Sequence, residues 1–146
     1  MKSFKILLDT NVVLDALQKR EPWNKDAESI ILKVAGDKVD GYLTTKQLCD
    51  IWYLSKSIYS GEENAHKKCQ KIISNLCKIF KILDLVSDDI TEALAMERND
   101  FEDAVIISIA MRYGLDGIVT RNVRDYISNN DNIEVWSPKE FINDIM

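Results

Sequence analysis

The sequence has little histidine and no paired cysteines. Its 146 residues include one histidine, His66, and three cysteines, Cys49, Cys69 and Cys77, without a CxxC spacing. A single histidine makes a histidine-based zinc site or a Ser-His-Asp hydrolase hard to build. Separated cysteines in odd number argue against a disulfide framework and for a reducing compartment, and we interpret these three as core residues. Any catalysis by this chain therefore has to use carboxylates.

Long apolar runs are also missing. The longest ones, such as residues 104–107, are far too short to cross a bilayer, and the N-terminus has no signal-peptide pattern. We therefore expect a soluble, cytoplasmic protein with no membrane partner. A chain of 146 residues is long enough to bury a core of its own, so we expect one domain over residues 1–146.

An excess of positive charge is absent as well. The net charge is −5 and the pI is about 4.9, so the chain has no overall attraction for the phosphates of a nucleic acid. A nucleic-acid ligand would need a local source of positive charge. One candidate is a cation held by clustered carboxylates. Another is a set of basic side chains: Lys19, Arg20, Arg121 and Arg124.

What the sequence does contain is a regular alternation of strand and helix patterns. Apolar runs predict strands over residues 4–8, 39–44, 79–85, 117–120 and 132–136. Helical spacing of apolar residues predicts helices over 12–17, 26–35, 45–58, 62–78, 87–97 and 100–113, and a last helix capped by Ser137. Such alternation indicates an α/β fold with a mostly parallel sheet and helices on both faces.

The run FKILLDTN at residues 4–11 delivers an aspartate, Asp9, to the end of the first predicted strand. In open α/β sheets, ligands bind beyond the carboxyl ends of the strands, so a charge placed there is expected to face a ligand. The alternative is that Asp9 only caps the helix that follows, or forms a turn with its own backbone.

Further acids fall where this topology would bring them towards Asp9. Asp50 lies in an otherwise mostly apolar helix, a costly place for a charge without a partner or a metal. Asp100 and Asp103 open the apolar helix over 100–113, where they could instead be a cap and a favourable first-turn acid. Asp125 follows the strand that ends at residue 120, and it could be a solvated loop residue.

Three segments together carry a family resemblance. LLDTNVVLD at 7–15, DFEDAVIISIA at 100–110 and IVTRNVRDY at 118–126 resemble, in this order and at these separations, the PIN-domain nucleases, which include the VapC-like ribonuclease toxins of toxin–antitoxin pairs. The likeness runs from residue 4 to about residue 141. It implies a three-layer α/β/α sandwich, an acidic pocket that binds Mg²⁺ or Mn²⁺, and hydrolysis of RNA. An antitoxin protein and a second copy of the chain are the candidate protein partners.

The resemblance also assigns residues. Asp9 and Asp103 match the first and third acids of the family, and Asp50 takes the second position, where glutamate is commoner. The fourth position is open between Asn122, which follows Thr-Arg, and Asp125 three residues later. Residues expected to orient the carboxylates or bound water are Thr10, Asn11, Asp100, Thr120 and Asn122.

Carboxylate oxygens are the ligands that hard divalent cations prefer, and such cations activate water and neutralise charge at a phosphate. The main alternative is a catalytically degenerate PIN-like module that binds RNA or protein, because two of the four acid positions depart from the family pattern. A haloacid-dehalogenase-type phosphatase fits less well, since it would need an aspartate at position 11, where this chain has Asn11. A phosphoacceptor receiver domain likewise lacks its acceptor aspartate and lysine at the expected strand ends.

Overall fold

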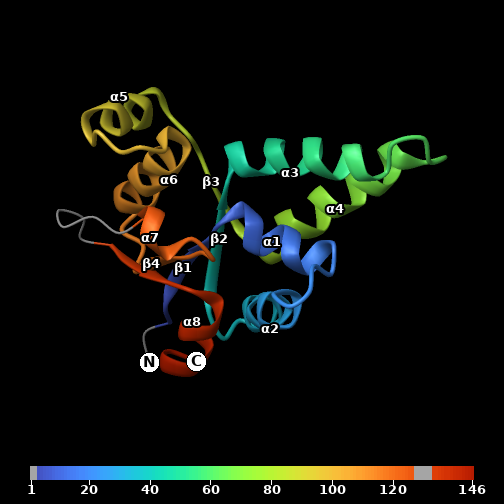
Figure 1. Cartoon of the computed structure of the whole chain (residues 1–146), viewed down its shortest axis with the longest axis horizontal. Helices are drawn as coiled ribbons and strands as arrows, with labels where there is room; N and C mark the ends of the chain where they lie inside the picture. Colours follow the sequence, from blue (N-terminus) through green and yellow to red (C-terminus); the bar gives the residue numbers. More distant parts are fainter. Residues whose placement is uncertain (1–2, 127–132) are drawn as a thin grey trace.

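The computed structural model describes residues 3–126 and 133–146 and places helices on both faces of one five-stranded sheet (Figure 1). The strands of this described part are β1 Lys5–Leu8, β2 Asp40–Thr44, β3 Lys81–Leu83, β4 Gly117–Val119 and β5 Glu134–Trp136. Its helices are α1 Thr10–Leu17, α2 Asn24–Ala35, α3 Thr45–Ile58, α4 Ala65–Ile79, α5 Ser87–Ala95, α6 Phe101–Arg112, α7 Val123–Tyr126 and α8 Pro138–Asp144. None of these helices has the length and apolar character needed to span a membrane.

All strand pairs are parallel, and the order across the sheet is β3-β2-β1-β4-β5. The chain moves outward from β1 to β2 and β3 and then crosses to β4 on the other side of β1. In open α/β sheets, the ligand crevice lies at such a reversal, outside the carboxyl ends of the strands. Leu8 pairs with Val119, so the next residues, Asp9 and Thr120, leave the sheet side by side.

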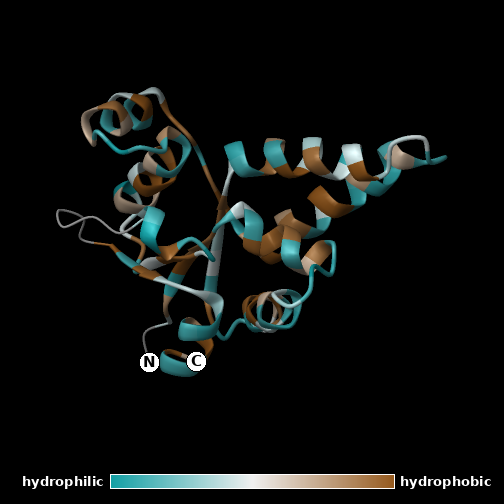
Figure 2. Cartoon of the chain, viewed as in Figure 1, coloured by the Kyte–Doolittle hydropathy of each residue, from teal (hydrophilic) through white to brown (hydrophobic). Residues whose placement is uncertain are grey.

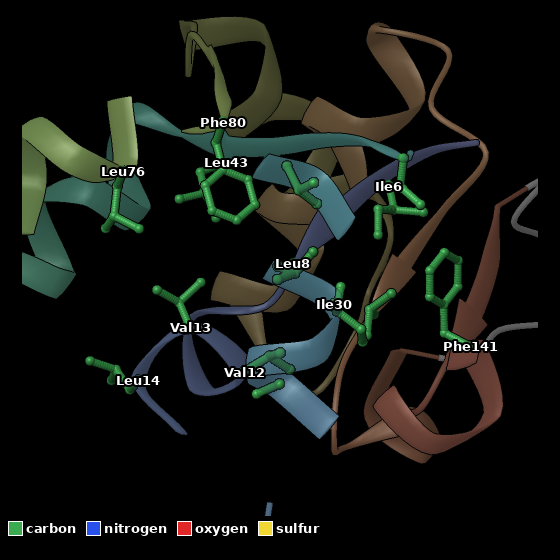
Figure 3. Close-up of a cluster of buried hydrophobic side chains, with 14 of the residues drawn as sticks. Ile6, Leu8, Val12, Val13, Leu14, Ile30, Leu43, Leu76, Phe80 and Phe141 are labelled. Carbon is green, nitrogen blue, oxygen red and sulfur yellow. The ribbon is translucent and has the colours of Figure 1, made fainter. Parts of the chain in front are cut away.

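The sheet separates two cores because side chains point alternately to opposite faces along a strand. In β1, Ile6 and Leu8 enter a core with α1, α2, α4 and α8, whereas Leu7 enters a second core with α5 and α6. Figure 3 shows the first core, in which Val12 of α1 and Phe141 of α8 lie near these strand residues. The predicted α/β/α sandwich with a parallel sheet is therefore confirmed.

Polar caps fix where two of the predicted helices begin. Thr44 Oγ1 accepts from the Gln47 backbone N–H at 3.1 Å, and Gln47 Oε1 accepts from the Thr44 N–H at 2.8 Å. Gln47 also donates to the Leu8 carbonyl at 2.7 Å, which ties the start of α3 to the end of β1. Ser137 and Glu140 form the same reciprocal cap on α8. The Ser137 cap was expected from the sequence, and it is present.

Beyond the sheet, α3 and α4 pack against each other and extend away from it (Figure 1). Hydrophobic and hydrophilic residues alternate along both helices (Figure 2). The helix predicted over 62–78 begins only at Ala65, because Asn64 has a left-handed backbone with φ of 67° that an α-helix does not contain. The strand predicted over 79–85 is shorter, because Ile79 still belongs to α4.

Two further expectations can be compared with the structure. The strand predicted over 132–136 is present as β5, and Asn132 lies outside the described residues. The interpretation of the cysteines as core residues is right for Cys69, which is buried, and wrong for the other two. Cys49 and Cys77 are exposed because α3 and α4 turn these positions to solvent.

Gly117 in β4 has no room for a side chain. A Cβ added there would lie 2.6 Å from the Glu134 carbonyl oxygen and would also strike the ring of Trp136. We expect Gly117→Ala to lower the free energy of unfolding by about 1–3 kcal/mol or more, measured by urea denaturation, because backbone of the neighbouring strand cannot move aside cheaply. Gly36→Ala is the control, since its nearest contact would be 3.3 Å. Equal effects of the two variants would contradict the packing of β4 on β5.

Candidate active site

Asp9 and Thr120 meet at the carboxyl edge of the sheet. The Asp9 backbone N–H donates to the Val119 carbonyl at 2.9 Å, which continues the pairing of β1 with β4 by one bond. The Thr120 hydroxyl donates to Asp9 Oδ2 at 2.8 Å and accepts from the Asn122 N–H at 3.1 Å. Because an ionised carboxylate can only accept, the hydroxyl proton points to Asp9.

Asp9 is also the N-cap of α1. Its Oδ1 accepts from the Thr10 backbone N–H at 2.8 Å. The capping role that the sequence left as an alternative is thus present together with the placement at the strand end. Asp100 likewise has two roles. Its side chain caps α6 by accepting from the Asp103 N–H at 3.0 Å, and it also lines the pocket described next.

A cavity of about 440 Å³ opens at this edge of the sheet, between α3, α6 and the segment that follows β4. All four acids expected from the sequence line it, and Thr10, Asn11 and Asn122 line it as well. Thr120 is fully buried and reaches the site through its hydrogen bonds to the Asp9 carboxylate and the Asn122 N–H. Six carboxylates of the described chain face the cavity: Asp9, Asp50, Asp100, Glu102, Asp103 and Asp125.

Tyr126 links two of these acids from the floor of the cavity. It is almost fully buried, and its hydroxyl donates to Asp9 Oδ1 at 3.3 Å and also hydrogen-bonds Asp103. Burial raises the pKa of the Tyr126 phenol, and the negative charges of Asp9 and Asp103 raise it further. The hydroxyl therefore keeps its proton at neutral pH and serves as a donor between two carboxylates that would otherwise repel each other.

Two carboxyl groups of the pocket, those of Asp103 and Asp9, have a raised pKa, and burial is the largest cause in each. Burial, together with the charges of Asp100, Asp9 and Asp125, raises the pKa of Asp103 to about 6, although the hydrogen bond from Tyr126 opposes the shift. Burial also raises the pKa of Asp9 against the hydrogen bonds that it accepts. A raised carboxyl pKa means that the charged form is disfavoured in the folded protein, and a bound cation would relieve that cost.

On the opposite wall, Asp50 is paired with a lysine. Lys46 Nζ donates to Asp50 Oδ2 at 2.5 Å and lies 3.6 Å from Glu102 Oε1. Burial would lower the pKa of Lys46, but the hydrogen bond to Asp50 and the charges of Asp50 and Glu102 outweigh it, so the pKa lies above its usual value. Lys46 is thus a charged member of the pocket.

The donor set suits a hard divalent cation, since it consists of carboxylate oxygens with amide and hydroxyl groups beside them. As the side chains stand in residues 3–126 and 133–146, no three of the His, Cys, Asp or Glu residues form a ready metal-ligand group. Hydrogen bonds hold these side chains in place: Thr120 and Tyr126 hold Asp9, and Lys46 holds Asp50. A cation would have to draw the carboxylates inward.

Among the pocket residues that sequence reasoning missed, three carry a charge or a hydrogen bond within the site: Lys46, Glu102 and Tyr126. Lys46 had a signal, because it precedes Asp50 by four residues, the spacing of a pair on one helix face. Glu102 lies beside Asp103 in the first turn of α6 and was treated only as part of the family motif. Tyr126 follows Asp125 directly, but nothing in the sequence indicates that its hydroxyl reaches back to Asp9, 117 residues earlier.

The basic residues suggested as a source of positive charge do not line this cavity. Arg121 and Arg20 turn to Asp15, a buried residue of α1, with Arg121 Nε 2.7 Å and Arg20 Nη1 3.8 Å from its carboxylate. Lys19 lies 3.4 Å from Glu28. Among the described residues that line the pocket, Lys46 is the one with a positive charge.

The fold and the pocket together define an α/β protein with a carboxylate site at the switch point of a parallel sheet. The family model described as "PIN domain" matches residues 5–124, and the chain therefore belongs to the PIN-domain family. No curated protein sequence matches the chain. Membership of this family supports a nuclease.

Solved structures with a similar fold include proteins of toxin–antitoxin systems. A toxin–antitoxin complex from Klebsiella pneumoniae matches with a TM-score of 0.65 and 18% identity over 91% of this chain and 97% of that chain. DNA-bound VapBC from Salmonella typhimurium matches with a TM-score of 0.61 and 18% identity, over 91% of this chain and 98% of that chain. VapC20 of Mycobacterium tuberculosis, a sarcin–ricin loop cleaving toxin, matches with a TM-score of 0.57 and 13% identity, over 77% of this chain and 86% of that chain. At these identities the likeness shows the fold alone.

Proposed function

We propose that this protein is an endoribonuclease that hydrolyses RNA phosphodiester bonds with Mg²⁺ or Mn²⁺ held in the carboxylate pocket. The observation that carries the proposal is the convergence of six carboxylates on one cavity at the carboxyl edge of the sheet, in a chain of the PIN-domain family. Such a density of negative charge opposes folding and RNA binding alike unless a cation occupies it. An oxygen-only donor set selects hard cations.

The ligands of the proposal are Asp9, Asp50 and Asp103, with either Asn122 or Asp125 as the fourth. When bound, the cation supplies a water of lowered pKa and neutralises charge on the scissile phosphate. The residues of this chain do the rest. Thr120 and the Thr10 N–H fix the two oxygens of Asp9, and the Tyr126 hydroxyl holds Asp9 and Asp103 at a set separation.

The biological setting is part of the same proposal. The similar structures include a toxin–antitoxin complex, a DNA-bound VapBC and a toxin that cleaves the sarcin–ricin loop. By analogy with them, we propose RNA as the substrate and an antitoxin protein as partner. We also propose a homodimer as the assembly and the cytoplasm as the location. A neighbouring reading frame that encodes a small DNA-binding protein would support the toxin assignment.

The cleavage products test the mechanism. With Mg²⁺ or Mn²⁺ the purified protein is expected to leave 5′-phosphate and 3′-hydroxyl ends, because water and not the ribose 2′-hydroxyl attacks the phosphorus. End groups can be read by mass spectrometry of a short RNA, with excess chelator as the control that abolishes cleavage. Cyclic 2′,3′-phosphate ends, or full activity in chelator, would overturn the mechanism, whereas DNA cleavage in addition to RNA cleavage would not.

One observation favours a second candidate. Asp50 is engaged by Lys46, and no metal-ligand group stands ready among the described residues. In a PIN-like module that only binds RNA or protein, Lys46 would keep Asp50 and the carboxylates would never gather around a metal ion. RNA binding without cleavage, across Mg²⁺ and Mn²⁺ concentrations up to the millimolar range, is the result that would select this candidate over the nuclease.

A further inference from the structure

Lys46 bridges two walls of the acidic pocket. It is the second residue of α3, Asp50 lies one turn later on the same helix, and Glu102 lies in the first turn of α6. Its ammonium contacts both carboxylates, at 2.5 Å and 3.6 Å. The lysine side chain is 27% exposed, less than either acid, so it lies inside the pair and not at its edge.

Helix stability does not explain a lysine at this position. The N-terminal end of a helix carries partial positive charge, and a cation in the first turn is unfavourable there. The order of the pair is also the weaker one, because a lysine that precedes its acid by four residues opposes the helix dipole. The free energy that favours Lys46 at this position therefore comes from the pocket, where it is the one cation among the described lining residues and faces six carboxylates.

We infer that Lys46 is a built-in counter-ion that holds Asp50 in the metal-free protein and must release it when a divalent cation binds. The inference rests on the proposed metal site. The ammonium occupies Asp50 Oδ2 and lies close to Glu102, so it competes with a bound cation for the same carboxylate and repels that cation. Lys46 is then a positioning residue, which stabilises the empty pocket and weakens its affinity for the cation.

The test is Mn²⁺ binding, measured by the loss of the free-ion EPR signal, on the purified full chain. We expect Lys46→Met to bind Mn²⁺ roughly tenfold more tightly or better, a change that corresponds to about 1.4 kcal/mol. Lys46→Gln, which is also neutral, should behave in the same way. Lys46→Arg should keep the affinity of the unmodified protein, because it retains the charge and can reach the same carboxylates.

Lys56→Met is the matched control for a general change of charge. Lys56 is an exposed lysine of the same helix, ten residues on and therefore about 15 Å further along its axis. At physiological ionic strength that exceeds the Debye length of about 8 Å, so its removal should leave Mn²⁺ affinity unchanged. A second readout is thermal unfolding in chelator, where Lys46→Met should melt below the unmodified protein and Lys46→Arg should not.

The outcomes separate the inference from the proposed function. Equal Mn²⁺ affinity in the unmodified protein and Lys46→Met, or an equal gain in Lys56→Met, would overturn the inference and leave the metal site standing. Weaker binding by Lys46→Met would overturn it too, because the lysine would then support the cation. Failure of every variant to bind Mn²⁺ would remove the proposed metal site and the inference with it.

Discussion

Replacement of Asp9 or Asp103 by asparagine is expected to reduce RNA cleavage by roughly a hundredfold or more, because loss of a residue that merely orients a metal ligand already costs about 10–100-fold. In chelator, the same variants should melt at or above the temperature of the unmodified protein. Burial raises the pKa of both acids, so the folded protein disfavours their charged forms. Asparagine keeps an acceptor oxygen for the cap and for Tyr126 but removes the charge.

The raised pKa of Asp103 also predicts how the stability of the metal-free protein changes with pH. Between the ordinary aspartate pKa of 3.8 and the raised pKa of about 6, Asp103 binds more protons in the folded protein than in the unfolded chain. Stability in chelator should therefore fall as the pH rises from about 4 to about 6, after which the contribution of Asp103 is complete. Asp103→Asn should remove most of this decrease. Thermal unfolding at several pH values, with chelator and with Mg²⁺ or Mn²⁺, measures it.

Asp88→Asn is the control for both variants. Asp88 lies in the first turn of α5, as Asp103 does in α6, but it is exposed and does not line the pocket. It should keep full activity and the full stabilisation by metal. A native-state ligand stabilises by RT ln(1 + [L]/Kd), so the unmodified protein and Asp88→Asn should gain more from Mn²⁺ than the two pocket variants. Equal gains in all four proteins would leave Asp9 as a helix cap and Asp103 as an acid of the first turn of α6, with no role in metal binding.

The carboxyl edge of the sheet could be predicted because it follows from local patterns and one topological rule. An apolar run that ends in Asp9, a second that ends in Thr120, and alternation of strands with helices place both residues at one edge of a parallel sheet. Asp103 follows in the same way, since it precedes a run that is buried from Ala104 to Ala110 and must lie against the sheet.

What could not be predicted depends on side chains that meet from distant parts of the chain. The Tyr126 hydroxyl reaches Asp9 from the end of α7, 117 residues further along the chain. Glu102 approaches Lys46 only because α6 and α3 flank the same cavity. Neither contact is predicted by a periodic pattern of apolar residues or by a helix-capping motif. The basic residues show the same limit, since composition gives their charge but not their partner.

Asp15 is the clearest case of such a hidden partner. Its side chain is 1% exposed in α1, and Arg121 binds it with Nε at 2.7 Å and Nη2 at 3.2 Å. Arg20 lies further away, at 3.8 Å. The guanidinium of Arg121 also lies over the ring of Trp23, 3.9 Å from its centroid. Arg121 therefore connects the segment after β4 to the helix after β1, directly behind Thr120 and Asp9.

Removal of the Arg121 side chain should lower the free energy of unfolding more than a substitution at an exposed position does. Arg121→Met leaves the Asp15 carboxylate buried with only the more distant Arg20, and loss of one partner of a buried ion pair costs about 3–5 kcal/mol. Urea denaturation should show that loss as a lower midpoint at unchanged slope. Arg124→Met is the control, because Arg124 is exposed on α7, and it should change stability by less than about 0.5 kcal/mol.

The double variant Asp15→Leu with Arg121→Met decides what the pair does. If the cost of Arg121→Met comes from an uncompensated buried charge, removal of that charge as well should restore most of the lost stability, since an apolar pair of similar volume often replaces a buried ion pair without loss. If Arg121 instead acts as a contact for RNA, Arg121→Met should weaken RNA binding and leave the urea midpoint unchanged. A double variant as unstable as Arg121→Met alone would show that the stacking on Trp23, and not the ion pair, holds this corner of the fold together.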